Sequence, residues 1–369
     1  MNDAAPIHYV DMAAQFAEQR DEIMTRIEAV LAKGKLVGGP DIETLEKEVA
    51  GFCGVAHAVA LNSGTDALAL GMAALGIGAG DEVILPPNSF IASAAAVAAI
   101  DAVPVFADVR DDLNMEPERV EAVITPQTKA IMPVHLTGRI AHMAPLADMA
   151  EQHGLLIVED ASQSFGSRYK DRLAGSFGDV GCFSAHPLKN FNAAGDSGFL
   201  TTDDGELAEK VARMGNHGLI GKGLSEAFGH VSRMDTLQAS ILRYKLEVLS
   251  DVIERRRGNA VLYVELLDPE HVFMIPEQDM EFNTYHTFVI QVDRRDELKA
   301  HLAEAGIGSA VHYPVPIHLQ PAASYLGYKA GDFPVAERQA GRILSLPVHQ
   351  NLSEGDVRRV ADAVNGFFG

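Results

Sequence analysis

Residues 155–200, LLIVEDASQSFGSRYKDRLAGSFGDVGCFSAHPLKNFNAAGDSGFL, decide the fold of this chain. The apolar run 155–158 is typical of a buried parallel strand, and two carboxylates, Glu159 and Asp160, follow it directly. A segment punctuated by glycine leads to a second apolar run, after which the pattern Ser-x-x-x-x-Lys ends at Lys189. The stretch therefore predicts a carboxylate at the end of one strand and an amine shortly after the next.

This pair of groups suits pyridoxal phosphate (PLP). The aldehyde of PLP needs a lysine amine to form a Schiff base, and its pyridine nitrogen needs a carboxylate to stay protonated. Lys189 and Asp160 supply both groups if the fold places them on opposite sides of one ring. In isolation each has an ordinary alternative, because an Asp after a strand usually caps a helix or forms a turn, and a Lys beside Asn is usually a solvated surface residue. The surrounding motifs favour the cofactor.

Several motifs closely resemble those of the DegT/DnrJ/EryC1/StrS family of PLP-dependent sugar aminotransferases. They are residues 159–163 (EDASQ), 183–190 (FSAHPLKN) and 195–198 (GDSG), and the resemblance extends from residues 10–12 (VDM) to 345–347 (SLP). It implies an α/β fold of the aspartate aminotransferase type (PLP-dependent transferase fold type I). It also implies transfer of an amino group from L-glutamate to a nucleotide-linked keto sugar, in amino-sugar or polysaccharide biosynthesis.

The turn 62–66 (NSGTD) predicts a phosphate site. It joins a strand-like segment, 55–61, to a helix rich in Ala and Leu. Such a turn offers unpaired amides, a hydroxyl and the positive end of the helix dipole to a phosphate. Simple N-capping would explain an isolated Ser-Gly-Thr. The family motif instead assigns Gly64 and Thr65 to the PLP phosphate, together with the Ser184 hydroxyl.

Two further cofactor contacts follow from the resemblance. Phe90 corresponds to the aromatic residue that lies flat on the pyridine ring, a contact worth about 0.5–1.5 kcal/mol beyond area burial. A core Phe after a strand is the alternative. Gln163 is expected to hydrogen-bond near the phenolic oxygen of the ring. The expected cofactor contacts are Gly64, Thr65, Phe90, Asp160, Gln163, Ser184 and Lys189, of which Asp160 and Lys189 are catalytic.

The substrate pocket and the partner subunit are also assigned by resemblance. Residues 312–321 (HYPVPIHLQP) are similar to the segment that shapes the sugar pocket in relatives acting on 3-keto sugar nucleotides, which assigns His312, Tyr313 and His318 to the substrate. A 3-keto sugar is favoured over a 4-keto sugar, and the nucleotide (UDP, dTDP or GDP) is left open. Relatives build each site from two chains, so a homodimer with shared active sites is expected.

One motif departs from the family. Relatives usually carry Gly-x-Asn-x-Arg-Met, whose Asn reaches the PLP phosphate from the neighbouring subunit. This chain has Val231 at the Asn position, and valine has no side-chain donor. Either the contact is missing, or Ser232, His230 or an adjacent amide replaces it.

Strands and helices alternate through Leu200, which predicts a mostly parallel, doubly wound central sheet flanked by helices, with the site at the carboxyl ends of the strands. From about Ser250 the pattern changes to that of a smaller α+β unit. We therefore expect a large PLP-binding α/β domain, residues 1–249, and a small C-terminal α+β domain, residues 250–369. His135 matches a family motif and either borders the cofactor or is a hydrogen-bonded structural histidine.

The composition argues against several classes of protein. The net charge of −21 and the isoelectric point of about 5.0 argue against nucleic acid or an anionic membrane as partner. The two cysteines, Cys53 and Cys182, lie in apolar surroundings, which indicates reduced thiols and a cytoplasmic protein. No metal-ligand spacing occurs, no apolar run approaches the length of a membrane span, and residues 1–7 lack the plan of a signal peptide.

Three rival functions fit the sequence less well. A PLP-dependent sugar dehydratase of this family carries histidine in place of the Schiff-base lysine, whereas this chain keeps Lys189. A PLP-sensing regulatory protein needs a DNA-binding module, and no basic stretch is present for one. A dinucleotide-binding protein needs Gly-x-Gly-x-x-Gly after a strand, which does not occur. Transamination is the favoured activity.

Overall fold

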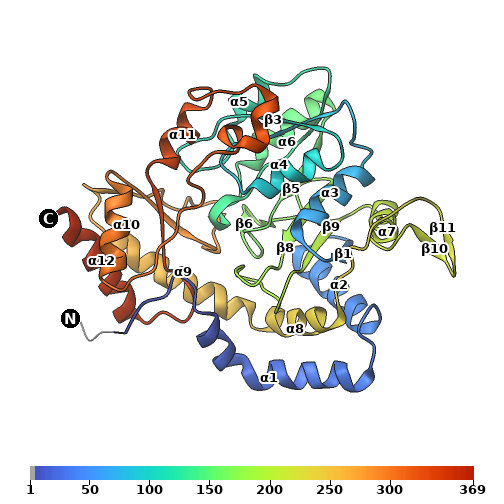
Figure 1. The fold of residues 1–369 in the computed structure, drawn as a ribbon, viewed down its shortest axis with the longest axis horizontal. Coiled ribbons are helices and arrows are strands. Elements are labelled where there is room, and N and C mark those ends of the chain that lie inside the picture. Colours follow the sequence, from blue (N-terminus) through green and yellow to red (C-terminus); the bar gives the residue numbers. More distant parts are fainter. Residues whose placement is uncertain (1–4) are drawn as a thin grey trace.

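A computed structural model of the chain describes residues 5–369 (Figure 1). Its centre is a seven-stranded sheet in the order β1-β9-β8-β5-β4-β2-β3, in which only β9 runs antiparallel to its neighbours. The predicted mostly parallel sheet is therefore confirmed. The strands are β1 (His57–Leu61), β2 (Glu82–Leu85), β3 (Val103–Phe106), β4 (Thr128–Ile131), β5 (Leu156–Asp160), β8 (Val180–Ser184) and β9 (Gly198–Thr202).

Helices cover both faces of this sheet, which is why its strands read as continuous apolar runs. Along β2, Ile84 packs into one hydrophobic cluster and Val83 into another, because successive side chains of a strand point to opposite faces. The helices of this part are α1 (Met12–Lys33), α2 (Pro40–Cys53), α3 (Gly64–Ala74), α4 (Ile91–Ala98), α5 (Pro117–Glu121), α6 (Met143–His153), α7 (Gly205–Met214) and α8 (Thr236–Glu247).

A second unit follows Val248, which ends α8 and begins the next helix. Its antiparallel sheet has the order β12-β14-β15 and shares a third hydrophobic cluster with the helices around it. The elements are α9 (Leu249–Leu266), β12 (Val272–Phe273), β14 (Phe288–Val292), α10 (Arg295–Glu304), α11 (Pro334–Ala340), β15 (Ile343–Leu346) and α12 (Glu354–Phe368).

The segment 317–340 departs from this division. Ile317, Phe333 and Ala336 pack into the same hydrophobic cluster as α3 and α4, so this part of the C-terminal sequence lies on the large sheet. Figure 1 shows α11 beside the β3 end of the molecule. The division of the chain at residues 249 and 250 stays a prediction.

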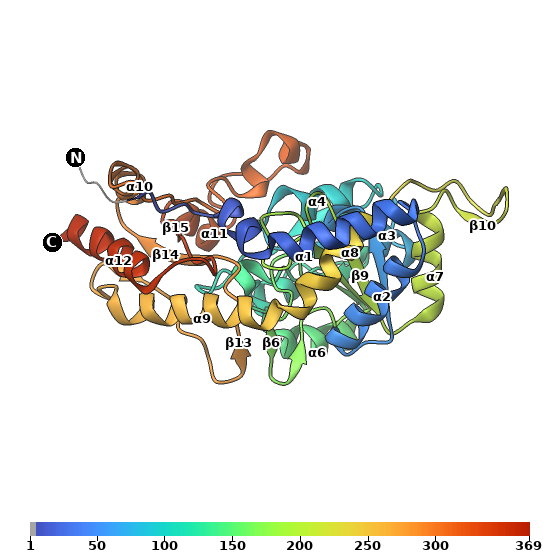
Figure 2. The same ribbon diagram turned by 90° about the horizontal axis from the view of Figure 1, so that it is seen from below.

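Two small sheets lie outside these layers. Strand β6 (Arg168–Tyr169) pairs with β7 (Arg172–Leu173) on one side and with β13 (Glu281–Phe282) on the other, which links the two units. The hairpin of β10 (Leu219–Gly221) and β11 (Leu224–Ser225) projects from the body, at the end of the molecule opposite both termini (Figures 1 and 2). Among residues 5–369, no helix combines the length and the apolar character needed to cross a membrane.

Candidate active site

A cavity of about 460 Å³ opens where β5 and β8 end, between the large sheet and the second unit. Its wall contains all seven residues that were expected to contact the cofactor, and also His312 and Tyr313. The large unit contributes the ends of its strands and the starts of α3 and α4, whereas residues 286–287, 312–313 and 348–349 come from the second unit. The fold thus brings nine of the ten predicted site residues to one space.

Asp160 and Lys189 line this cavity together. Asp160 ends β5, where its Oδ2 accepts a 2.6 Å hydrogen bond from the Ser93 hydroxyl and its Oδ1 accepts one from the Ser162 amide. Burial lowers the pKa of the Lys189 amine to about 8, and the Asp160 carboxylate opposes this shift. An amine with this pKa is partly neutral near pH 7, and the neutral form is the nucleophile.

The start of α3 forms a cradle beside this pair. Ser63 caps the helix by accepting a hydrogen bond from the Asp66 amide. A Cβ on Gly64 would lie 2.8 Å from the Ser184 Cβ, and one on Gly198 would overlap the Ser63 carbonyl. Glycine at both positions therefore lets the ends of β8 and β9 touch the N-terminus of α3. The unpaired amides there and the Ser184 hydroxyl suit a phosphate dianion.

Gln163, Tyr313 and Phe90 form another part of the cavity wall. The Gln163 Oε1 accepts a hydrogen bond from the Thr137 amide at 2.8 Å, and its Nε2 donates to the Tyr313 hydroxyl at 3.4 Å. Burial, with a contribution from Asp160, raises the pKa of Tyr313 to about 12, so its phenol stays protonated. Phe90 is half-exposed beside the Tyr313 ring and offers a flat apolar face to the cavity.

His318 lies outside the cavity. Its ring is buried against Phe106 and Phe333, and its Nε2 bonds to Glu337 at 3.1 Å. The 3-10 turn at 317–319 directs this side chain into the core on which the segment rests. His318 was predicted to bind the substrate in the sugar pocket. In the structure its side chain lies in the core instead.

His135 is a structural histidine, which is the second of its two predicted alternatives. Its Nε2 bonds to Glu159 at 2.9 Å, and its Nδ1 accepts from the Ala141 amide. Glu159 also accepts hydrogen bonds from the amides of Gly175, Phe177 and Gly178. Of the two carboxylates after the β5 run, Glu159 thus supports the strand and Asp160 faces the cavity.

Several polar residues of the cavity wall were not predicted from the sequence. Ser93 stands one helical turn after Phe90 at the start of α4, and this spacing on one helix face was a usable signal. Arg256, Thr287 and His349 come from three separate segments of the second unit. Only tertiary packing brings these three together, so no local pattern could have placed them.

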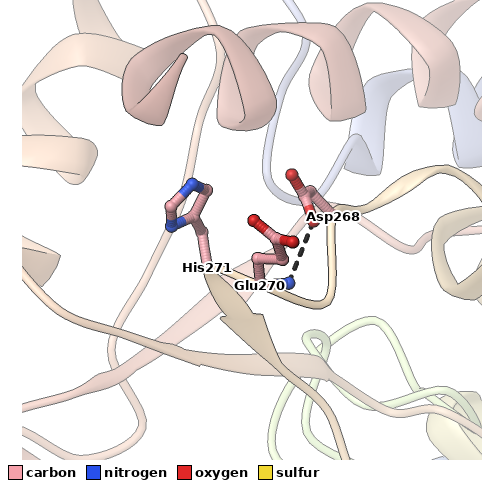
Figure 3. Close-up of side chains that lie close together, drawn as sticks. All are labelled: Asp268, Glu270 and His271. Carbon is pink, nitrogen blue, oxygen red and sulfur yellow. Dashed lines mark hydrogen bonds between the residues drawn. The ribbon is translucent and has the colours of Figure 1, made fainter.

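One group of potential metal ligands lies apart from the cavity. The ligand atoms of Asp268, Glu270 and His271 are within 4.8 Å of one another, on the turn between α9 and β12 (Figure 3). The Asp268 carboxylate accepts a hydrogen bond from the Glu270 amide, and the His271 ring stacks on Phe368. Both side chains therefore have structural roles in an exposed turn.

Comparisons of the sequence and of the structure with known proteins agree on one family. The model of the DegT/DnrJ/EryC1/StrS aminotransferase family matches residues 17–365. A UDP-N-acetyl-3-dehydro-alpha-D-glucosamine 3-aminotransferase of Acidithiobacillus ferrooxidans is 43% identical, covering 98% of both chains. A dTDP-3-amino-3,4,6-trideoxy-alpha-D-glucose transaminase of Streptomyces venezuelae is 41% identical, covering 97% of this chain and 95% of the relative. The crystal structure of S. venezuelae DesV in complex with a ketimine intermediate superposes with a TM-score of 0.96, at 40% identity and 99% coverage of both chains.

Proposed function

Because this chain belongs to the DegT/DnrJ/EryC1/StrS aminotransferase family and is a PLP-dependent sugar-nucleotide aminotransferase, we propose that it transfers the amino group of L-glutamate to a 3-keto sugar nucleotide. The observation that carries the proposal is that Lys189 and Asp160 line one cavity beside a phosphate cradle. The preference for a 3-keto sugar is supported by two similar enzymes whose names place the amino group on carbon 3. Their nucleotides differ, so the proposal leaves the nucleotide open.

The cavity fits PLP at three points. The amides at the start of α3, with Gly64, Thr65 and the Ser184 hydroxyl, would hold its phosphate. Asp160 would hold its ring nitrogen, and Lys189 its aldehyde carbon. When bound, PLP accepts the electron pair left behind as the substrate carbon loses its proton.

The residues of this chain supply the remaining chemistry. Ser93 and the Ser162 amide fix the carboxylate of Asp160, which would keep a proton on the pyridine nitrogen of bound PLP. Lys189, with a pKa of about 8, can take a proton from the substrate carbon that bears nitrogen and return it elsewhere. Gln163, whose Oε1 accepts a hydrogen bond from the Thr137 amide, would donate from its Nε2 to the phenolic oxygen of PLP.

We propose that the working form is a homodimer with shared sites, located in the cytoplasm, where the two buried free cysteines would stay reduced. The support is the projecting hairpin of β10 and β11 with the segment after it (Figure 2), whose exposed apolar side chains are Ile220, Leu224, Phe228 and Val231. The Ser232 hydroxyl bonds to Asn62 of its own chain at 3.2 Å. Ser232 is thus engaged, and we propose that the partner gives the PLP phosphate no side-chain donor from position 231.

The pyridoxamine form of the enzyme tests the substrate. It is mixed with UDP-, dTDP- and GDP-linked 3-keto and 4-keto sugars, and the return of the PLP absorbance is followed. The proposal expects at least one 3-keto sugar to react faster than its 4-keto isomer. Reaction with 4-keto sugars alone would contradict it.

A further inference from the structure

Three consecutive arginines on α9 differ in their partners. Arg255 pairs with Glu18 and Asp251, at 2.8 Å and 2.6 Å, and Arg257 pairs with Glu277 at 2.8 Å. Arg256 is 5% exposed, yet within residues 5–369 no carboxylate lies within 4.0 Å of its guanidinium. The two outer arginines each form ordinary ion pairs with carboxylates, whereas the middle one is a buried cation without a counterion.

Arg256 faces the active-site cavity. Its Nη1 donates to the carbonyls of Tyr285 and His286, at 3.2 Å and 3.4 Å, and its Nε has no partner within the described chain. Burial lowers the pKa of this guanidinium to about 10, so it is still charged at neutral pH. A buried charge that lacks a counterion destabilises the fold. A ligand with a negative charge would remove this penalty.

The described wall offers Arg256 a free hydrogen-bond donor but no carboxylate within 4.0 Å of its guanidinium. The Thr287 hydroxyl is buried and has no partner within residues 5–369, so it is free to donate to a ligand. The His349 Nε2 donates to the His8 carbonyl, which leaves the Nδ1 of this ring as an acceptor. Asp160 and Asp196 are the carboxylates of the described cavity wall, and Asp160 is occupied by Ser93 and Ser162. An unpartnered hydroxyl beside a cation without a counterion forms a site for an anion.

The charge and shape of this site select a carboxylate. One guanidinium carries one positive charge, and its planar fork matches the two oxygens of a carboxylate. Lys189 and Arg256 line the same cavity as His286. Burial is the largest of the effects that hold the pKa of His286 well below its usual range, so this ring is neutral and adds no charge.

We propose that Arg256, assisted by Thr287, binds a substrate carboxylate, and that this carboxylate belongs to the amino donor. The inference rests on the proposed function, in which L-glutamate delivers its nitrogen at Lys189. An amino acid lying between Lys189 and Arg256 places its nitrogen at the amine and a carboxylate at the guanidinium. A carboxylate carried by the sugar is the other source of the same chemistry.

The test compares Arg256→Gln with Arg255→Gln, a neighbour on the same helix that does not line the cavity. L-glutamate is titrated into the PLP-loaded enzyme, and the loss of the PLP absorbance gives the half-saturating concentration. We expect a rise of about 10- to 100-fold in Arg256→Gln, partial recovery in Arg256→Lys and no change in Arg255→Gln. Glutarate is a dicarboxylate without a nitrogen, so it can bind but cannot react. Calorimetric titration of the PLP-loaded enzyme with glutarate should show the same loss of affinity in Arg256→Gln.

The sugar half-reaction separates the two sources of carboxylate. In Arg256→Gln, the pyridoxamine form should react normally with keto-sugar nucleotides, whether or not the sugar carries a carboxylate. A loss confined to carboxylated sugars, with L-glutamate unaffected, would overturn the assignment to the amino donor. Unchanged half-saturation and unchanged glutarate affinity would overturn the site altogether.

Two controls distinguish failure of the Arg256 site from failure of the proposed function and from failure of the variant to fold. If the wild-type enzyme shows no absorbance change with any amino acid or keto sugar, the proposed function fails, whatever the variants do. If Arg256→Gln does not fold, Thr287→Val replaces it, because the Thr287 hydroxyl makes no other hydrogen bond within the described chain. We expect Thr287→Val to weaken glutarate and L-glutamate by about 2- to 10-fold, and unchanged values would contradict the site.

Discussion

The Ser93 hydroxyl donates a 2.6 Å hydrogen bond to Oδ2 of Asp160, from the first turn of α4 to the end of β5. Ser89 extends this chain, with its Oγ 2.7 Å from that of Ser93. Both serines line the cavity together with Asp160. The orientation of the carboxylate is thus set by a residue 67 positions away in the sequence.

We expect Ser93→Ala to slow the L-glutamate half-reaction by about 10-fold while the enzyme keeps its PLP. The reason is that Asp160 loses the donor that fixes one of its oxygens. Stopped-flow absorbance measures the rate, and the pH profile of the PLP band reports the state of the ring. Ser93→Thr keeps the hydroxyl and should recover much of the rate. An unaltered rate and pH profile in Ser93→Ala would show that the hydrogen bond plays no part.

Gly198→Ala should weaken PLP binding and destabilise the protein by about 1–3 kcal/mol. An added Cβ would overlap the backbone of Ser63 and push β9 away from the start of α3. Dialysis with absorbance measures PLP retention, and thermal unfolding measures stability. Gly51→Ala is the matched control, because Gly51 lies inside α2, where an added Cβ would meet no atom within 4 Å. Equal PLP retention in both variants would contradict the cradle.

The capture of PLP by the apoenzyme should become faster as the pH rises through about 8. Lys189 is protonated below this pKa and becomes the neutral nucleophile above it. Because the Asp160 carboxylate raises this pKa, Asp160→Asn should move the midpoint to lower pH. The growth of the PLP absorbance against pH measures both midpoints. A midpoint above pH 10, or one that moves upward in Asp160→Asn, would contradict the assignment.

Val231→Asn should tighten PLP binding by about 2- to 10-fold, since it supplies a side-chain donor at the position where relatives carry Asn. Equilibrium dialysis of PLP measures the change. Val264→Asn on α9 is the control, because Val264 is also half-exposed and does not line the cavity. Equal affinities in the two variants would argue against a shared site in which residue 231 faces the phosphate of the partner.

The sequence predicted the parts of the site whose geometry is local. Asp160 directly ends a strand and Lys189 closely follows the next, and parallel neighbouring strands bring such residues to one edge. His318 was predicted to bind the substrate, and nothing in its segment reveals that its ring lies outside the cavity, against Phe106 and Phe333. Arg256 escaped detection for the same reason: its sequence neighbours are also arginines, and only the folded chain shows which one lacks a carboxylate.

The central claim is that the amine of Lys189 holds the cofactor opposite Asp160. Borohydride reduction of the PLP-loaded enzyme, followed by mass mapping of its peptides, identifies the lysine that carries the cofactor. We predict a phosphopyridoxyl group on the peptide that contains Lys189, and none in Lys189→Ala. Attachment to another lysine in an active enzyme would contradict this claim, and so would full activity of Lys189→Ala.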